Sequence, residues 1–190
     1  MWGEDPLTFA LLIIDMLNDF IKGSLKIPRA EEIINNIKRL INKFHAYKMP
    51  VIYVNDSHIK GVDRELSLWG QHAIEGSWGS QVIDELKPME GDFIVKKRRY
   101  SGFFSTDLDL LLNELNVKSL VLTGVATDIC VQHTAADAFY RGYEVIVVSD
   151  ATAALNDERH ERALSYMREV YGAKILKTAE VEEMISKPQP

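Results

Sequence analysis

The chain has 190 residues, of which 46% are hydrophobic and 26% charged, and these are the proportions of an ordinary globular domain. A single cysteine excludes a disulfide scaffold, because a bridge needs two. The longest apolar run, residues 9–14, is too short to span a membrane. The net charge of −6 disfavours nucleic acids and anionic membranes as partners. Because the first residues lack the basic region of a secretory signal, we expect a cytoplasmic protein with a reduced thiol.

The first half of the chain alternates between apolar runs of strand length and segments of helical periodicity. Residues 7–14 are apolar on both faces, which is typical of a buried strand. Apolar side chains from Ile33 to Phe44 recur at helical spacing and predict a helix over residues 30–47. A second strand is predicted over 51–54. The polar, glycine-containing stretch from 56 to 79 then follows, and loops of that length in a compact domain are often functional.

The second half continues the alternation. Its predicted strands cover residues 93–95, 119–122, 145–148 and 174–176. Helices are predicted over residues 128–141 and 158–170. Two more are predicted, one with Ser105 as its cap and a last one that begins at Thr178. Strands that alternate with helices predict a single α/β domain over residues 1–190. We expect a three-layer α/β/α sandwich with a six-stranded, mainly parallel, Rossmann-like sheet.

The residues that follow the predicted strands carry most of the chemistry. In sheets of this kind, ligands bind beyond the carboxyl ends of the strands. Asp15 ends the first strand, two lysines end the third, and a glycine-containing turn with the only cysteine, Cys130, follows the fourth. Side chains alternate between the faces of a strand, so Lys96 and Lys97 point to opposite faces, and periodicity does not choose between them.

Cys130 is a candidate nucleophile. It lies in the predicted first turn of a helix, where unpaired N–H groups and the helix dipole stabilise a thiolate, and a nearby lysine would lower the pKa of the thiol further. The Asp15 carboxylate could take the thiol proton and hand it to a leaving amine. The alternatives are structural roles: a small buried hydrophobic residue for the cysteine, a cap for the aspartate, and a solvated strand end for the lysine.

A second group of residues has the spacing of metal ligands. Asp56 and His58 are two residues apart at a strand end, so their side chains can point the same way. With His72 they offer two imidazoles and a carboxylate, a plausible ligand set for zinc or iron. The alternative for these residues is a polar pocket wall or a subunit contact.

These residues carry a family resemblance. The chain resembles the isochorismatase-like cysteine hydrolases, which include nicotinamidases and N-carbamoylsarcosine amidases. The resemblance covers nearly the whole length. It rests on the number, order and spacing of short motifs, at residues 12–20, 55–58, 69–72, 76–79, 95–103, 124–131, 137–138, 142 and 149–151.

The resemblance implies a catalytic triad of Asp15, Lys97 and Cys130. The lysine of this family usually stands three residues before a Tyr-Ser pair, which selects Lys97 over its neighbour. The resemblance also implies a cis peptide bond between Val125 and Ala126, which would aim the Ala126 N–H, together with that of Cys130, at a developing oxyanion.

The family also suggests a cofactor and a reaction. In nicotinamidases an Asp-x-His pair and a later histidine bind a metal, and Asp56, His58 and His72 match that pattern. Isochorismatases that cleave a vinyl ether tend to lack the cysteine, so Cys130 favours amide cleavage. We expect a cysteine-dependent amidohydrolase that cleaves a C–N bond of a small amide, imide or ureido compound through a thioester, without an organic cofactor. The alternatives are a catalytically silent binding or redox-sensing protein and a vinyl ether hydrolase.

Aromatic residues are candidates for the pocket and for a subunit contact. Phe20, Trp69 and Phe104 are candidate walls for a flat substrate, although each is also plausible in the core. Oligomers are common in the family that the chain resembles, and the aromatic-rich stretch around Trp69 and Trp78 could supply an interface. We therefore expect a homo-oligomer, a dimer or a tetramer.

Overall fold

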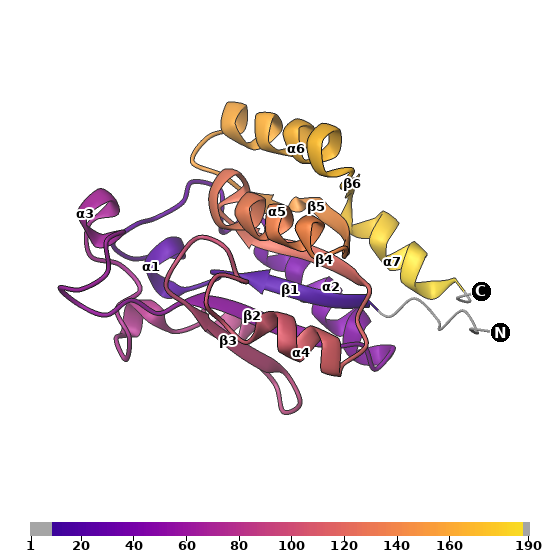
Figure 1. Ribbon diagram of the computed structural model, residues 1–190, viewed down its shortest axis with the longest axis horizontal. Coiled ribbons are helices and arrows are strands. Elements are labelled where there is room, and N and C mark those ends of the chain that lie inside the picture. Colours follow the sequence, from indigo (N-terminus) through magenta and orange to yellow (C-terminus); the bar gives the residue numbers. More distant parts are fainter. Residues whose placement is uncertain (1–8, 188–190) are drawn as a thin grey trace.

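A computed structural model describes residues 9–187 of the chain. Its centre is a six-stranded sheet in the order β3-β2-β1-β4-β5-β6, in which all neighbouring strands are parallel (Figure 1). The predicted α/β class is confirmed, and the sheet is wholly rather than mainly parallel. Residues 7 and 8 of the predicted first strand lie outside the described residues. The strands are β1 (Phe9–Ile14), β2 (Val51–Asp56), β3 (Phe93–Lys97), β4 (Ser119–Val125), β5 (Glu144–Ala153) and β6 (Lys174–Leu176).

Helices cover both faces of the sheet and complete the three layers (Figure 1). One face carries α4 (Leu108–Glu114), α5 (Gln132–Tyr140) and α6 (Asp157–Tyr171), and the other carries α2 (Ile34–Ala46) and α7 (Thr178–Ser186). Short elements gather near the carboxyl ends of the strands: α1 (Asn18–Ile21), α3 (Leu66–Trp69) and the 3₁₀ turns η1 (Trp78–Ser80) and η2 (Asp84–Leu86). Within residues 9–187, no helix has the length and apolar character needed to cross a membrane.

The uninterrupted apolar run of β1 reflects its place in the middle of the sheet. Leu11 and Ile13 pack into the core under α2 and α7, while Leu12 and Ile14 pack into the core under α4, α5 and α6. All four side chains are fully buried. Burying a Leu or Ile side chain contributes about 1.5–3 kcal/mol, so both faces of this strand stabilise the fold.

The connection between β2 and β3 contains no long helix, in agreement with the long polar loop predicted over residues 56–79. The connecting residues 57–92 have no apolar stripe at helical spacing, and they form only α3, η1 and η2. Gly61, Gly70 and Gly76 adopt φ values of 74°, 76° and 77°. Such values interrupt a helix, and glycine adopts them at little cost. The connection therefore folds over the carboxyl ends of the strands, where it contributes several residues to the candidate site.

Three predicted helix starts differ from the structure. The helix predicted from residue 30 begins at Ile34, because residues 30–33 form turns after Arg29, which has a φ of 63°. Ser105 has a φ of 54° and caps no helix, since α4 begins at Leu108 after Asp107. The helix predicted from residue 128 opens with a π-helical turn, η3 (Thr127–Val131), before α5 begins.

Gly124 allows β4 to approach β1 closely. Its φ is 99°, and a Cβ atom at this position would lie 1.9 Å from the carbonyl oxygen of Ile14. Only a residue without a side chain fits there. The close approach brings the end of β1, where Asp15 stands, next to the turn that follows β4.

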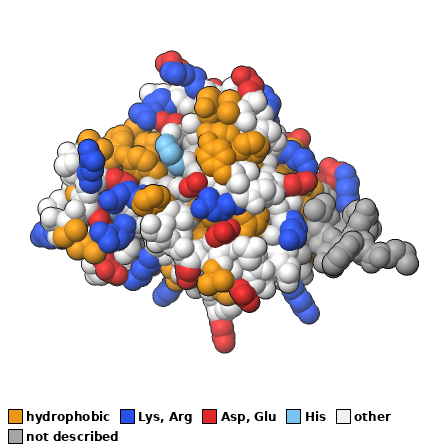
Figure 2. All heavy atoms as spheres, viewed as in Figure 1, with side chains coloured by type: hydrophobic (Ala, Val, Ile, Leu, Met, Phe, Trp, Pro, Cys, Tyr) orange, Lys and Arg blue, Asp and Glu red, His pale blue; other side chains and the backbone are white. Residues whose placement is uncertain are grey.

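Exposed aromatic side chains gather on the outer face of α5 and α6 (Figure 2). Phe139 and Tyr166 are about half exposed, and Tyr140 is more exposed. The ring of Tyr171 lies 5.9 Å from that of Phe139 and 5.5 Å from that of Tyr166. These side chains are remote in sequence from the Trp69 and Trp78 stretch that was expected to supply a subunit contact.

Candidate active site

Asp15 is the first residue after β1, and its side chain is completely buried. Its φ is 53°, in the left-handed region that Asp and Asn tolerate better than most residues. The amide of Asp56 donates a hydrogen bond of 2.7 Å to Asp15 Oδ1, which ties the end of β1 to that of β2. The second carboxylate oxygen, Oδ2, lies 2.8 Å from Lys97 Nζ and forms an ion pair with it.

Lys97 ends β3 and is buried among the same strand ends. Its Nζ lies 2.8 Å from Asp15 Oδ2, 2.6 Å from Asp56 Oδ1 and 3.5 Å from Cys130 Sγ. Burial disfavours the ammonium charge, but the charges of Asp15 and Asp56 outweigh it and raise the pKa of Lys97 well above its ordinary value. Lys96 points to the opposite face and is exposed. The structure thus brings Lys97, and not Lys96, to the cysteine.

Cys130 lies on η3 and is 6% exposed. Burial raises the pKa of its thiol well above the ordinary value, and the positive charge of Lys97 only partly opposes this rise. The expectation of a low-pKa thiolate at a helix start is therefore wrong, because desolvation outweighs the lysine charge. Because burial disfavours the thiolate, the thiol needs a base that takes its proton as the sulfur reacts.

The pKa of Asp15 suits that proton transfer. Burial and the nearby charge of Asp56 raise the pKa of Asp15 from 3.8 to about 6, against the opposing charge of Lys97. One of its carboxylate oxygens lies within 4.8 Å of Cys130 Sγ. A carboxylate with a pKa near the working pH is an effective proton acceptor and donor.

The turn before Cys130 has an unusual backbone. The peptide bond between Val125 and Ala126 is cis. The amides of Ile129 and Val131 both donate to the Ala126 carbonyl oxygen, at 3.0 and 3.2 Å. These bonds hold the turn in place beside the thiol.

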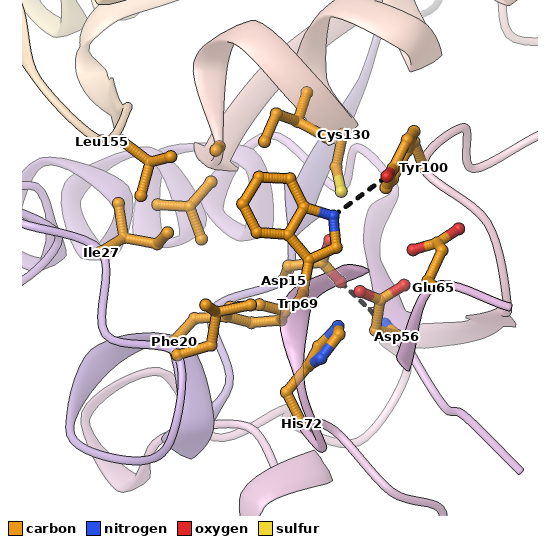
Figure 3. Close-up of a pocket in the computed structure, with 14 residues that line it drawn as sticks. Asp15, Phe20, Ile27, Asp56, Glu65, Trp69, His72, Tyr100, Cys130 and Leu155 are labelled. Carbon is orange, nitrogen blue, oxygen red and sulfur yellow. Dashed lines mark hydrogen bonds between the residues drawn. The ribbon is translucent and has the colours of Figure 1, made fainter. Parts of the chain in front are cut away.

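A small pocket opens beside Cys130 (Figure 3). Its open volume is about 40 Å³, which holds a few water molecules. The indole of Trp69 lies across it and donates a hydrogen bond of 3.0 Å to the Tyr100 hydroxyl. A substrate with a ring therefore requires this wall to move. The pocket is lined by Asp15, Phe20, Leu25, Ile27, Asp56, Glu65, Trp69, His72, Tyr100, Val125, Ala126, Ile129, Cys130 and Leu155.

Two of the three predicted pocket walls line this cavity. Phe20 and Trp69 do, whereas Phe104 is 57% exposed and lies outside it. Phe104 follows β3 on a surface loop, beside Arg98 and Arg99. Glu65 and Tyr100 line the cavity but were not predicted, since both belong to irregular segments without a periodic signal.

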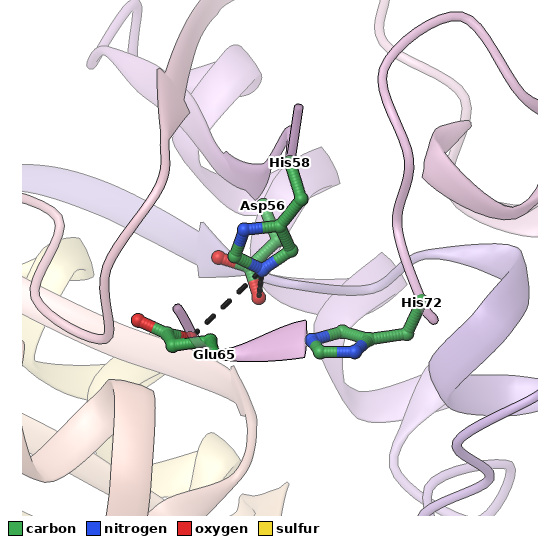
Figure 4. A group of neighbouring side chains, drawn as sticks. All are labelled: Asp56, His58, Glu65 and His72. Carbon is green, nitrogen blue, oxygen red and sulfur yellow. Dashed lines mark ion pairs between the residues drawn. The ribbon is translucent and has the colours of Figure 1, made fainter. Parts of the chain in front are cut away.

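The predicted metal ligands come together beside the pocket (Figure 4). Asp56, His58 and His72, together with Glu65, offer ligand atoms that all lie within 4.8 Å of one another, and all four residues are buried. Burial and the charge of Asp56 raise the pKa of Glu65 to about 7.

Two atoms of this cluster lack hydrogen-bond partners in the described part of the chain. These atoms are His58 Nε2 and Glu65 Oε1, and both are buried. Leaving buried polar atoms unpaired costs free energy, and a metal ion would satisfy them. Two imidazoles and two carboxylates form a donor set that suits zinc or iron. The residues present therefore fit a divalent metal ion.

The chain belongs to the isochorismatase family of hydrolases, since the isochorismatase domain matches residues 9–180. It is similar to the crystal structure of N-carbamoylsarcosine amidase from Thermoplasma acidophilum, with 43% identity, a TM-score of 0.85, and coverage of 90% of this chain and 97% of that one. Nicotinamidase PncA from Bacillus subtilis is 34% identical, with a TM-score of 0.86 and coverage of 90% and 100%. These neighbours within the family are amidases.

A further structural neighbour contains a metal. It is the pyrazinamidase of Pyrococcus horikoshii in complex with zinc, which is 31% identical, with a TM-score of 0.83 and coverage of 89% of this chain and 98% of that one. Some relatives therefore bind zinc, and this chain has a candidate metal site.

Proposed function

We propose that this hydrolase is a cysteine amidohydrolase that cleaves the C–N bond of a small amide, imide or ureido compound. Asp15, Lys97 and Cys130 are its proposed catalytic residues. The observation that carries the proposal is their convergence from the ends of β1 and β3 and from the turn after β4. Lys97 Nζ lies 2.8 Å from Asp15 Oδ2 and 3.5 Å from Cys130 Sγ, and Asp15 and Cys130 line the same pocket. A nucleophile beside an acid–base group and a fixed charge is the arrangement that acyl transfer requires.

The reaction follows from this geometry in two halves. Asp15 takes the thiol proton as Cys130 Sγ attacks the substrate carbonyl carbon, and the N–H groups of Ala126 and Cys130 stabilise the oxyanion. The protonated Asp15 then gives its proton to the leaving nitrogen, the C–N bond breaks, and a thioester remains. In the second half Asp15 takes a proton from water, the hydroxide adds to the thioester, and the C–S bond breaks to release the acid. Asp15 then returns its proton to Cys130 Sγ, which restores the starting state. Lys97 stabilises the Asp15 carboxylate at each stage in which it is ionised.

The pocket lining favours a neutral substrate. It contains Asp15, Asp56 and Glu65 but neither lysine nor arginine, and its remaining residues are mostly apolar or aromatic. N-carbamoylsarcosine has a carboxylate, which would find no lysine or arginine side chain in this lining. We therefore propose a flat, uncharged amide that fits between Phe20 and Trp69.

We also propose that Asp56, His58, Glu65 and His72 hold a divalent metal ion, zinc or iron, beside this pocket. When bound, the ion would offer a Lewis-acidic position to a substrate atom. Asp56 would then serve both groups, because its Oδ1 pairs with Lys97 and its Oδ2 lies 3.5 Å from His58 Nε2.

The buried thiol makes the redox-sensing alternative weaker. Sensor cysteines are accessible and have a low pKa. Cys130 is 6% exposed, and burial raises the pKa of its thiol. A complete set of Asp15, Lys97 and Cys130 has no evident use in such a sensor.

Intact-protein mass spectrometry tests the proposal. The protein is mixed briefly with neutral aromatic amides, N-carbamoyl amino acids and aldehydes. We expect an adduct on Cys130 that is absent from Cys130→Ala, and ammonia release that is faster with the neutral amides. Turnover by Cys130→Ala would refute the mechanism, whereas faster turnover of N-carbamoyl amino acids would refute only the neutral substrate class.

The expected homo-oligomer and the cytoplasmic location stay predictions. Light scattering of the purified protein tests the first, and fractionation of the source cells tests the second.

A further inference from the structure

The two ring nitrogens of His58 have different surroundings. Nε2 faces Asp56, Glu65 and His72 and has no hydrogen-bond partner in the described part of the chain. Nδ1 lies 3.3 Å from Oδ2 of Asp63, a residue outside the metal-ligand cluster. Both side chains, His58 and Asp63, are completely buried. A neutral imidazole has one N–H, so the acceptor at Nδ1 determines which nitrogen keeps its lone pair.

Hydrogen bonds from two segments of the chain hold the Asp63 carboxylate in place beside His58 Nδ1. Its Oδ2 accepts the Ile59 amide at 2.8 Å, and Arg98 Nη2 and Nε donate to its Oδ1 at 2.5 and 2.9 Å. Arg98 follows β3 directly, while Asp63 lies on the connection that follows β2. The carboxylate is therefore attached to two separate segments and cannot turn away from the imidazole without breaking charge-assisted hydrogen bonds.

We propose that Asp63 is a positioning residue of the metal site, with Arg98 as its anchor. Asp63 accepts the Nδ1–H of His58, which leaves the Nε2 lone pair aimed at the other three ligands. A carboxylate behind a ligating histidine fixes the ring and makes it a stronger donor. The inference rests on the proposed metal site and concerns a residue outside the catalytic triad.

A purely structural role for Asp63 predicts different results. By accepting the Ile59 amide, Asp63 also stabilises the loop, so its loss could weaken metal binding only by loosening the fold. Asp63→Asn keeps an amide oxygen that can accept from the ring and from Ile59 but loses an acceptor for Arg98, whereas Asp63→Ala accepts from none of them. The tautomer of His58 separates the two roles, because a purely structural role for Asp63 does not determine it. Asn156→Ala provides a matched control, since it removes a helix cap on α6 far from the cluster.

Two measurements test the proposal. Nitrogen-15 NMR of the metal-free protein at alkaline pH reports the tautomer of His58, with the signal assigned from His58→Asn. Competition with a chromogenic chelator reports Zn²⁺ affinity. We expect the Nδ1–H tautomer in the wild type and in Asp63→Asn, and a loss of that defined tautomer in Asp63→Ala. Zn²⁺ affinity should fall about 10- to 100-fold in Asp63→Ala and much less in Asp63→Asn and Asn156→Ala.

Three results would overturn the proposal. They are an Nε2–H tautomer in the wild type, unchanged affinity in Asp63→Ala, and equal losses of affinity in Asp63→Ala and Asn156→Ala. A wild-type protein that binds no Zn²⁺ overturns the metal site as well. Amidase activity through Cys130 is measured separately, so failure of the metal site is distinguishable from failure of the proposed reaction.

Discussion

Replacing Asp15 by Asn should stabilise the protein while it abolishes turnover. Asp15 is buried, and burial and the charge of Asp56 raise its pKa from 3.8 to about 6. At about 1.4 kcal/mol for each pH unit, the ionised carboxylate destabilises the folded state by about 3 kcal/mol at neutral pH. Asn carries no charge, tolerates the φ of 53°, and keeps an oxygen for the Asp56 amide. It also leaves one ion pair, Lys97 with Asp56, that is balanced in charge.

The same substitution should remove a pH dependence of stability. The folded-state pKa of Asp15 is raised above the unfolded value, so the folded chain holds this proton more tightly. The resulting stabilisation is fully present below about pH 3.8 and is lost as the pH rises through about 6. The wild type should therefore lose stability across this window through Asp15, and Asp15→Asn should lack that contribution.

Urea unfolding of both proteins between about pH 4 and pH 8, followed by circular dichroism, measures the effect. We expect Asp15→Asn to be more stable than the wild type by up to about 3 kcal/mol above pH 6, with the difference shrinking as the pH falls. Asp15→Ala is the control, because it leaves the Asp56 amide without its acceptor and should destabilise the fold. If Asp15→Asn is less stable than the wild type above pH 6, or keeps its full pH dependence, the reasoning is wrong.

Three further substitutions test other parts of the structure. Lys97→Met should destabilise the fold by about 3–5 kcal/mol in urea unfolding at neutral pH, since it leaves two buried carboxylates without their cation. A cost below about 1 kcal/mol would show that these buried ion pairs do not stabilise the fold. Gly124→Ala should lower the free energy of unfolding by about 3 kcal/mol or more in the same assay, because its Cβ would meet a carbonyl oxygen of β1. Gly172→Ala should lower it by only about 1–2 kcal/mol, because Gly172 has a positive φ but open space around it. Equal costs for the two glycines would be evidence against the close strand approach. Tyr100→Phe removes the hydrogen-bond partner of the Trp69 indole, worth about 1 kcal/mol, and should lower KM about fivefold with little change in kcat, because the wall that moves to admit a ring is held less firmly. An unchanged KM would show that this bond does not shape the pocket.

Much of the fold is predictable because it depends on local patterns. The six strands stand where apolar runs of strand length predict them, and the parallel order follows from their alternation with helices. The exception is the connection over residues 57–92, which has no helical stripe and contains the helix-interrupting glycines. Periodicity reports which faces of a segment are apolar, but it does not report how an irregular segment folds.

Some residues of the candidate site are likewise predictable from the sequence, and others are not. Asp15 and Cys130 are predictable as strand-end residues, because parallel strands place their carboxyl ends at one edge. Glu65 and Tyr100 are not, since each reaches the pocket through an irregular segment whose path depends on packing. Phe104 has an aromatic side chain that would suit a pocket wall, but its loop lies outside the cavity and leaves that side chain exposed.

The sequence by itself determined the class of fold, the position of Asp15 and Cys130 at one sheet edge, and the family, because these are encoded in the spacing of residues along the chain. The family pattern selected Lys97 over Lys96, but only the tertiary structure placed its Nζ 3.5 Å from Cys130 Sγ. Only the tertiary structure decided that Glu65 joins the metal-ligand cluster and that burial raises the pKa of the thiol. These properties depend on burial and on distances between groups far apart in the chain. Such distances exist only after the two cores have packed against the sheet.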